Sequence, residues 1–189
     1  MIKFLKWTIG TIVVLGLLFY FVGIPYIKTQ TKKKSPEQTV LFGDSINGKS
    51  VKLTVTYCKP YKKGRAIFGG LVPFGKVWRT GANENTVFTT DKDLTIGGKK
   101  LPAGEYSLWT IPEKDKWTII WNKKQYGWGI RFDGVASREA EYDAIQVEVG
   151  VETQSPELEQ FNIAFQKNGN TINLILAWDT TKITVPISF

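Results

Sequence analysis

Histidine is absent from the 189 residues of this chain, and cysteine occurs once, as Cys58. Without imidazole the chain cannot build a Ser-His-Asp or Cys-His catalytic device or a His-ligated metal site. A single cysteine cannot form an intramolecular disulfide, and it leaves no cysteine cluster for zinc. We therefore expect neither a metal nor a cofactor, and any chemistry must use other side chains.

Acidic residues are missing from the first 34 positions, which hold six lysines. These lysines account for most of the formal net charge of +8, since residues 35–189 hold 19 basic and 17 acidic side chains. A face that binds nucleic acid concentrates Lys and Arg on the folded domain. We therefore expect no nucleic-acid partner, and the basic N-terminal flank indicates a membrane instead.

Charged side chains are also missing from residues 7–27, WTIGTIVVLGLLFYFVGIPYI. As a helix this segment would span about 31 Å, the thickness of a bilayer's hydrocarbon core. Trp7 and Tyr26 suit the two membrane interfaces. The pattern predicts an uncleaved anchor over residues 1–28, with the lipid bilayer as partner of residues 7–27. A cleavable signal peptide fits less well because bulky residues follow where a small-x-small cleavage site is needed.

Two lysines and the amino terminus precede the apolar segment and four lysines follow it, so the positive charges are nearly balanced, with a slight excess after the segment. Counted alone, this excess leans toward a cytoplasmic C-terminal domain. A short basic tail before a long apolar run is, however, typical of an export signal that is retained. We therefore predict a membrane-anchored protein whose domain lies on the exported side, periplasmic or extracellular.

Helical periodicity is missing from the rest of the chain, except around residues 135–143. Residues 29–39 are predicted to be a polar tether, and residues 40–189 a single domain. Within it, apolar and polar residues alternate with the period of β-strands. The clearest runs are VKLTVTY (51–57), KWTIIWN (116–122), AIQVEVGV (144–151), FNIAF (161–165) and KITVPISF (182–189).

Turn signals separate these runs at Gly97-Gly98, at residues 112–116 and at Asn168-Gly169. Pro186 lacks a backbone donor, which predicts that the last strand lies at a sheet edge. Nine or ten short strands with frequent turns predict an all-β fold, an antiparallel β-sandwich. A closed β-barrel is the alternative.

Four stretches are distinctive beyond their composition: GRAIFGGLVPFGKVWRTGANENT (64–86), LPAGEYSLWTIP (101–112), WTIIWN (117–122) and Trp128-Gly129. They resemble an uncharacterised bacterial envelope family, domain of unknown function 2911, from about Ser35 to the C-terminus. The resemblance implies an exported β-sandwich behind a signal peptide or anchor, and it carries no established activity. The chain departs from the family pattern at Cys58, which argues against this thiol as a functional nucleophile.

The strongest candidate site is the segment that contains Arg79, Asn83 and Glu84. Alternation places Trp78 and Arg79 on opposite faces, and Asn83 can close a turn with its own side chain. In a functional interpretation, the three polar residues line a rim that binds a polar ligand such as a sugar or peptide. In a structural interpretation, Arg79 pairs with Glu84 and Asn83 caps the loop.

Three further features have both a functional and a structural interpretation. Trp109 and Trp128 lie near turns, where exposed rings could stack on a sugar, or they pack in the core. The glycine-rich loop of residues 64–75 matches neither phosphate-binding fingerprint, which favours a loop folded over the core. Glu84 with Asp91 or Asp133 could form the carboxylate pair of a glycoside hydrolase, whose separation a sequence does not give.

The leading functional hypothesis is a membrane-anchored envelope domain that binds a polar ligand or an envelope protein through its Arg79–Glu84 loop. One alternative is an envelope hydrolase that uses carboxylates without histidine, and another is a structural envelope protein. The lack of histidine favours binding over catalysis, so we assign no catalytic residue. The predicted ligand-binding residues are Arg79, Asn83, Glu84, Trp109 and Trp128.

Overall fold

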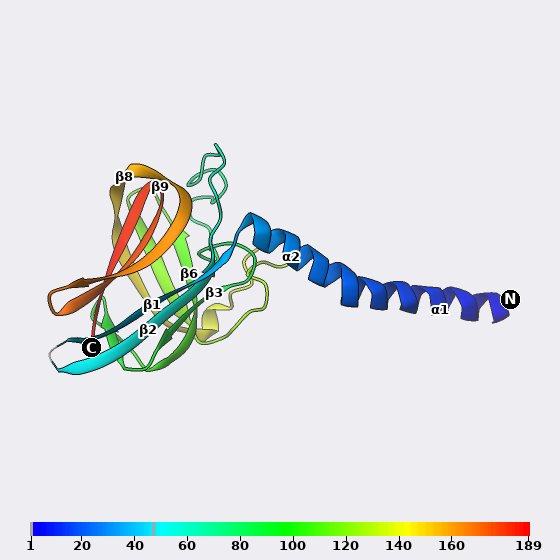
Figure 1. Ribbon diagram of the computed structural model, residues 1–189, viewed down its shortest axis with the longest axis horizontal. Coiled ribbons are helices and arrows are strands. Elements are labelled where there is room, and N and C mark those ends of the chain that lie inside the picture. Colours follow the sequence, from blue (N-terminus) through cyan, green and yellow to red (C-terminus); the bar gives the residue numbers. More distant parts are fainter. Residues whose placement is uncertain (1, 47) are drawn as a thin grey trace. The chain divides into compact units, whose positions relative to one another are not determined.

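The computed structural model describes residues 2–46 and 48–189 of the chain (Figure 1). The chain divides into a helical unit that ends at Lys34 and a compact β unit, residues 35–189. The helical unit consists of α1 (Ile2–Leu18), a π-helical turn η1 (Phe19–Gly23) and α2 (Ile24–Lys34). From Trp7 to Lys34 it is long and apolar enough to span a membrane, and most of its apolar side chains are exposed.

The prediction of a polar tether over residues 29–39 is corrected by the structure. The helix continues to Lys34 and the first strand begins at Glu37, so only Ser35 and Pro36 connect them. Lysine is a good helix former, which explains why the basic residues extend the helix. Pro36 disfavours the helical conformation of the residue before it, and this ends the helix.

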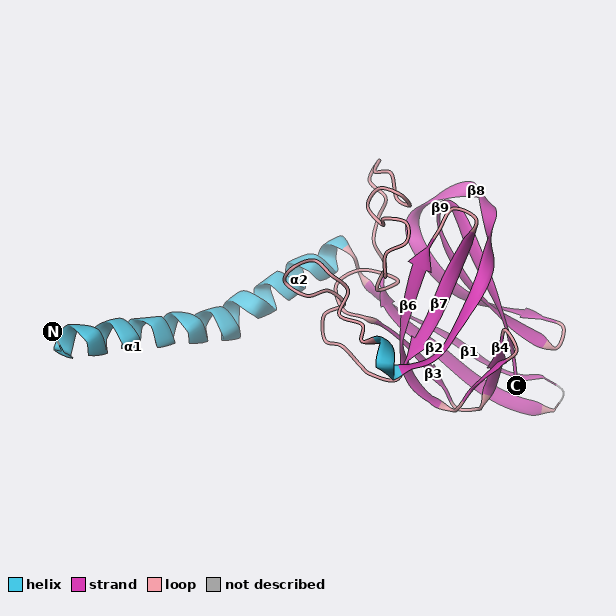
Figure 2. Ribbon diagram, turned by 180° about the vertical axis from the view of Figure 1, so that it is seen from behind, coloured by secondary structure: helices cyan, strands magenta, loops and turns pink. Residues whose placement is uncertain are grey.

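The β unit contains nine strands in its described part (Figure 2). They are β1 (Glu37–Ile46), β2 (Lys49–Cys58), β3 (Thr86–Thr90), β4 (Leu94–Ile96), β5 (Lys99–Leu101), β6 (Gly104–Pro112), β7 (Lys116–Asn122), β8 (Asp143–Asn168) and β9 (Thr171–Ser188). All pairs are antiparallel, in the order β1-β2-β3-β6-β7-β8-β9-β4-β5. The described sheet does not close, since β1 and β5 are its edges. The all-β, sandwich-like prediction is confirmed.

The longest strand, β8, pairs with β7 along its first part and with β9 along the rest (Figure 1). Its residues up to Gly150 pair with β7, and those from Val151 onward pair with β9. The predicted strands 144–151 and 161–165 are therefore one continuous strand with register shifts between its halves. The predicted edge position of the last strand is wrong, because β9 lies between β8 and β4. Pro186 is tolerated between the stretches that pair with these two neighbours.

The turn predictions are confirmed with one shift. Gly97 and Gly98 have φ of 55° and 76° and join β4 to β5, as a type I′ turn requires. Residues 113–115 join β6 to β7. The last hairpin pairs Asn168 with Thr171, so its turn is Gly169-Asn170 rather than Asn168-Gly169. Residues 135–143 contain only a short 3-10 turn, η2 (Ala140–Tyr142).

The core is made by the apolar faces of the alternating strands. Every second residue of the alternating runs that form β2, β7 and β9 is apolar and buried: Val51, Leu53, Val55, Tyr57, Trp117, Ile119, Trp121, Ile183, Val185 and Ile187. Ile67 and Val72 of the glycine-rich loop are also buried, which confirms that this loop covers the core. Trp78 contacts Trp178, Trp117, Phe161 and Phe68 in one aromatic cluster.

Three segments far apart in the sequence meet where β1 begins. The backbone N–H of Lys59 donates to Pro36 O, and the Asn83 side chain donates to Ser35 O at 3.4 Å. The N–H of Gly129 donates in turn to Asn83 O at 3.2 Å. We call this region the entry end of the domain. It comprises residues 35–37, Cys58, the loop of residues 59–85 and the loop of residues 123–142.

Candidate functional site

The segment of residues 78–84 is fixed to the sheet at its start. Trp78 and Thr110 of β6 exchange backbone hydrogen bonds of 2.7 and 3.0 Å, and Trp78 Nε1 donates to Gly81 O. Glycine is required at position 81 because a Cβ atom would lie 2.9 Å from Cys58 O. Asn83 has φ of 59°, and its side chain binds Ser35 instead of closing its own turn. The segment is thus packed between the ends of β1 and β2.

Arg79 is the least satisfied polar side chain of this segment. Its Nε and Nη1 atoms are buried without a hydrogen-bond partner among the described residues. Burial lowers the pKa of the guanidinium, and electrostatic interactions with Cys58 and Glu84 act in the opposite direction. Glu84 therefore influences Arg79 through its charge and satisfies neither of these two nitrogens. A closed Arg79–Glu84 pair does not explain why the guanidinium is buried here.

The aliphatic part of Arg79 lies against the backbone of Gly129. A Cβ atom at position 129 would lie 2.4 Å from Arg79 Cδ and 2.6 Å from Arg79 Cβ. Only glycine leaves room for this approach. Because Gly129 also binds Asn83 O, the loop of residues 123–142 covers the Arg79–Glu84 segment.

Glu84 belongs to a cluster with Cys58 and Glu37. One oxygen of each carboxylate and the Cys58 sulfur lie within 4.8 Å of one another. The thiol donates to Glu84 Oε2 at 3.4 Å. Burial raises the pKa of Cys58 to about 11, Glu84 and Glu37 add to this increase, and a hydrogen bond with Asn83 opposes it. The thiol is therefore protonated at neutral pH and is a poor nucleophile, as the sequence predicts.

The chemistry of this cluster suits hydrogen-bond donors better than a metal ion. Carboxylates and a thiolate are metal ligands, but the thiol would have to lose a proton whose pKa is about 11. The positive charge of Arg79 also lies close enough to act on Cys58 and Glu84, and it opposes a second cation. Glu37 and Glu84 can instead accept N–H or O–H groups, while Arg79 can donate to an acceptor oxygen.

The structure brings some of the predicted residues together and separates others. Arg79, Asn83 and Glu84 share the entry end, and Trp128 lies half-buried next to Gly129 on the loop that covers them. Trp109 is 0% exposed, and its Nε1 donates to Ser107 Oγ at 2.8 Å. Its ring offers no face to a ligand, so this prediction is corrected to a core position.

In the structure, Asp91 and Asp133 each bind groups other than Glu84. Asp91 follows the end of β3 and binds Lys52 N, whereas Glu84 precedes the start of the same strand. Five residues of strand separate the two by about 17 Å. Asp133 pairs with Arg131 and binds the N–H of Val135. The carboxylate closest to Glu84 in the site is Glu37, which the sequence analysis placed in a tether.

Three contributors to the site were not predicted. Glu37 has no distinctive motif, and its role depends on how β1 pairs with the end of β2. Cys58 was considered only as a nucleophile, although its place at the end of an alternating run puts it at a strand terminus. Gly129 was identified only as part of the Trp128-Gly129 pair, and the need for glycine arises from its contact with Arg79.

A protein-family model described as "Protein of unknown function (DUF2911)" matches residues 35–187. The chain belongs to the DUF2911 family. No curated protein and no solved structure matches the chain. The DUF2911 match begins where the compact β unit begins and includes Glu37, Cys58, Arg79, Glu84 and Gly129, so the whole candidate site lies within the family domain.

The raised pKa of Cys58 makes a prediction for this DUF2911 domain. The unfolded chain loses the thiol proton near pH 9, whereas the folded domain retains it to about pH 11. The unfolded state therefore binds fewer protons in this interval, and the thiol lowers the stability as pH rises. In Glu84→Gln the loss of the nearby negative charge lowers the thiol pKa, so this fall becomes smaller.

The test is urea unfolding of the full chain at pH 8 to 11, for wild type and Glu84→Gln. The comparison between the two proteins cancels the tyrosines that also titrate in this range. A pH slope that does not differ between them would contradict the coupling of Glu84 to Cys58.

Proposed function

We propose that this protein is a membrane-anchored binding module that holds a small polar ligand at the entry end of its DUF2911 domain. Residues 7–27 anchor the chain in a lipid bilayer, and the domain faces the exported side of the membrane. The length and apolar character of the helix support the anchor. The short basic tail before the long apolar segment supports a retained export signal.

The observation that carries the binding function is that the Nε and Nη1 atoms of Arg79 are buried and have no hydrogen-bond partner among the described residues. An unsatisfied buried donor costs about 1–3 kcal/mol, and more for a charged group. A planar guanidinium is satisfied best by a carboxylate or another acceptor with paired oxygens. The Nε and Nη1 donors that the described residues leave unpaired point in different directions, so each would need its own acceptor oxygen from such a ligand.

The neighbouring carboxylates define the other half of the ligand. Glu84 and Glu37 lie beside Cys58, and carboxylate oxygens are acceptors for N–H or O–H groups. A ligand that carries acceptor oxygens next to donors, as an acidic sugar or a peptide does, complements both halves of the site. The half-buried Trp128 lies on the covering loop and provides an adjacent apolar surface.

Arg79→Met tests whether the arginine serves binding rather than folding. Methionine keeps the aliphatic contact and removes the unsatisfied charge, so the free energy of unfolding stays unchanged or rises. The matched control is Arg138→Met. Arg138 forms a bidentate pair with Asp143, and their side chains are only 11% and 9% exposed. Breaking this buried pair is expected to cost about 3–5 kcal/mol.

Both variants are measured as full chains in lipid nanodiscs by urea unfolding. A loss in Arg79→Met as large as that in Arg138→Met would show that Arg79 is structural. This result would favour a structural envelope protein over a binding module.

Binding itself is tested with two probes that differ in charge, galacturonate and galactose. Galacturonate has a carboxylate beside hydroxyl groups and is expected to raise the urea midpoint of the wild-type chain at millimolar concentration. A ligand at 100 times its Kd stabilises a protein by about 2.7 kcal/mol. Galactose, and galacturonate with Arg79→Met, are expected to give no shift. Equal shifts in wild type and Arg79→Met would remove Arg79 from the binding site.

A further inference from the structure

The loop of residues 123–142 presents two apolar side chains to solvent at its tip. Phe132 is fully exposed, and Val135 is 51% exposed. Single exposed apolar residues are common and need no explanation. This pair differs because both side chains project from one tight turn, Arg131–Val135, which we call the Phe132 tip.

The Phe132 tip is closed by hydrogen bonds of its own. The N–H of Arg131 donates to Val135 O at 2.8 Å, and that of Gly134 donates to Arg131 O at 3.0 Å. Asp133 accepts from the N–H of Val135 and forms an ion pair with Arg131 at 3.2 Å. Gly134 supplies the positive φ of 80° that the turn requires. The exposed phenylalanine is therefore held outward by an ordered backbone.

The base of the tip is also fixed. Ile130 and Ala136 form a β-bridge, and the N–H of Ser137 donates to Gly129 O. The Ser137 hydroxyl donates to Trp128 O at 3.0 Å. Hydrogen bonds at the tip and at the base hold the turn in this conformation, so the apolar side chain stays exposed to water. This exposure costs free energy, and a partner outside the chain would remove the cost.

Chain connectivity places the tip at the entry end. Gly129, next to the base of the tip, binds Asn83, and Asn83 binds Ser35, the first residue after α2. The seven residues from Lys28 to Lys34 extend the helix by about 10 Å past its apolar part. Ser35 follows the helix directly in the chain, so the proposed anchoring would bring an apolar phase, the bilayer, within reach of this end of the domain.

We infer that the Phe132 tip is a second membrane contact, in which Phe132 and Val135 enter the boundary between lipid headgroups and acyl chains. This inference rests on the proposed anchoring by the N-terminal helix. Arg131 at the edge of the tip meets the lipid phosphates, and the charge of Asp133 is offset by its pair with Arg131. The contact would fix how the binding site is presented relative to the membrane surface.

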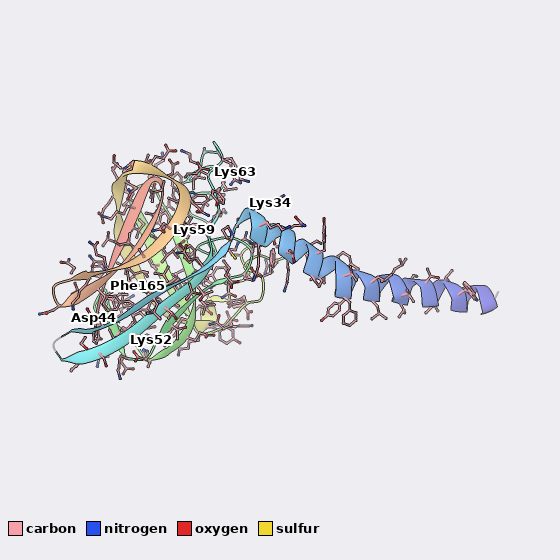
Figure 3. The ribbon with its side chains drawn as sticks, viewed as in Figure 1. Lys34, Asp44, Lys52, Lys59, Lys63 and Phe165 are labelled. Carbon is pink, nitrogen blue, oxygen red and sulfur yellow. The ribbon has the colours of Figure 1, made fainter. Side chains whose placement is uncertain are left out.

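The inference is tested with an environment-sensitive NBD label at Phe132→Cys in the full chain. Native Cys58 is buried with a thiol pKa of about 11, so it does not compete for the label at neutral pH. The matched control is Asn170→Cys at the turn between β8 and β9. Lys167, near this turn, binds Asp44 and Ser45 toward the far end of β1. Figure 3 shows Asp44 and Lys59 toward opposite ends of the β1–β2 pair.

Nanodiscs that contain anionic lipid are prepared with and without doxyl-labelled acyl chains. Position 132 is expected to emit at shorter wavelength than position 170 and to lose emission to doxyl quenching, because its label would lie at the boundary between headgroups and acyl chains. Position 170 is expected to show no quenching. A label at Val135→Cys is expected to behave like that at position 132. Equal emission and no quenching at positions 132 and 170 would overturn the inference.

Membrane anchoring is measured separately by flotation of the full chain with vesicles after an alkaline wash. Flotation without quenching at position 132 would leave the anchor intact and reject the Phe132 tip as a membrane contact. Loss of flotation would reject the anchor, and the inference would fail with it.

Discussion

Trp78→Ala is expected to lower the free energy of unfolding of the DUF2911 domain by about 3 kcal/mol, as large-to-small changes of aromatic residues in a core do. The Trp78 ring stacks on Trp178 with a centroid distance of 6.1 Å and an interplanar angle of 18°. It also meets Phe161 at 5.0 Å and Trp117 at 6.1 Å, edge to face. Alanine would leave a cavity among four rings and would free the segment that carries Arg79.

The control is Trp78→Phe. Phenylalanine keeps an aromatic ring in the cluster and loses the hydrogen bond from Trp78 Nε1 to Gly81 O. A loss of about 1 kcal/mol is expected for that bond. Both variants are followed by far-ultraviolet circular dichroism in urea, since the substitution changes the tryptophan fluorescence. A loss below 1 kcal/mol in Trp78→Ala would mean that the aromatic cluster does not anchor the site.

Gly129→Ala is expected to destabilise the domain by about 1–3 kcal/mol, the usual range for overpacking. The new Cβ would lie 2.4 Å from Arg79 Cδ and 2.6 Å from Arg79 Cβ, which is too close for carbon atoms that are not bonded to each other. The Arg79 Cβ is fixed by the backbone and cannot move aside as a side-chain end could. The loop or the arginine must shift, and we expect the stabilisation by galacturonate to be lost with it.

The same loop supplies a matched control at Gly127, where an added Cβ meets nothing within 4 Å. Gly127→Ala is expected to change the free energy of unfolding by no more than about 0.5 kcal/mol, as exposed substitutions usually do. The two variants are compared by urea unfolding and by their response to galacturonate. If both behave like wild type, the covering loop does not pack on Arg79.

These two contacts hold Arg79 from both sides. Trp78, the preceding residue, is anchored in the core, and Gly129 lies against the arginine stem from the opposite loop. A guanidinium fixed in this way loses little conformational freedom on binding, which favours affinity. Fixation of an unsatisfied charged group is expected where its role is recognition rather than stability.

Local patterns in the sequence were sufficient to predict the strands and most of the turns. Alternation identified Val51, Leu53 and Val55 as inward residues because side chains of a strand point to opposite faces in turn. The same reasoning could not show that residues 143–168 form one strand, because pairing with β7 and then with β9 is decided by distant partners. It also misplaced Trp109, since nearness to a turn does not determine burial.

The sequence by itself determined an apolar N-terminal helix and an all-β domain, and it excluded imidazole chemistry. These properties depend on residue types and on periodicity, which are local. Only the tertiary structure brought Glu37, Cys58 and Glu84 together and placed Gly129 against Arg79. Such contacts arise between residues up to 50 positions apart, because strand pairing and loop packing bring distant segments to the same end of the domain.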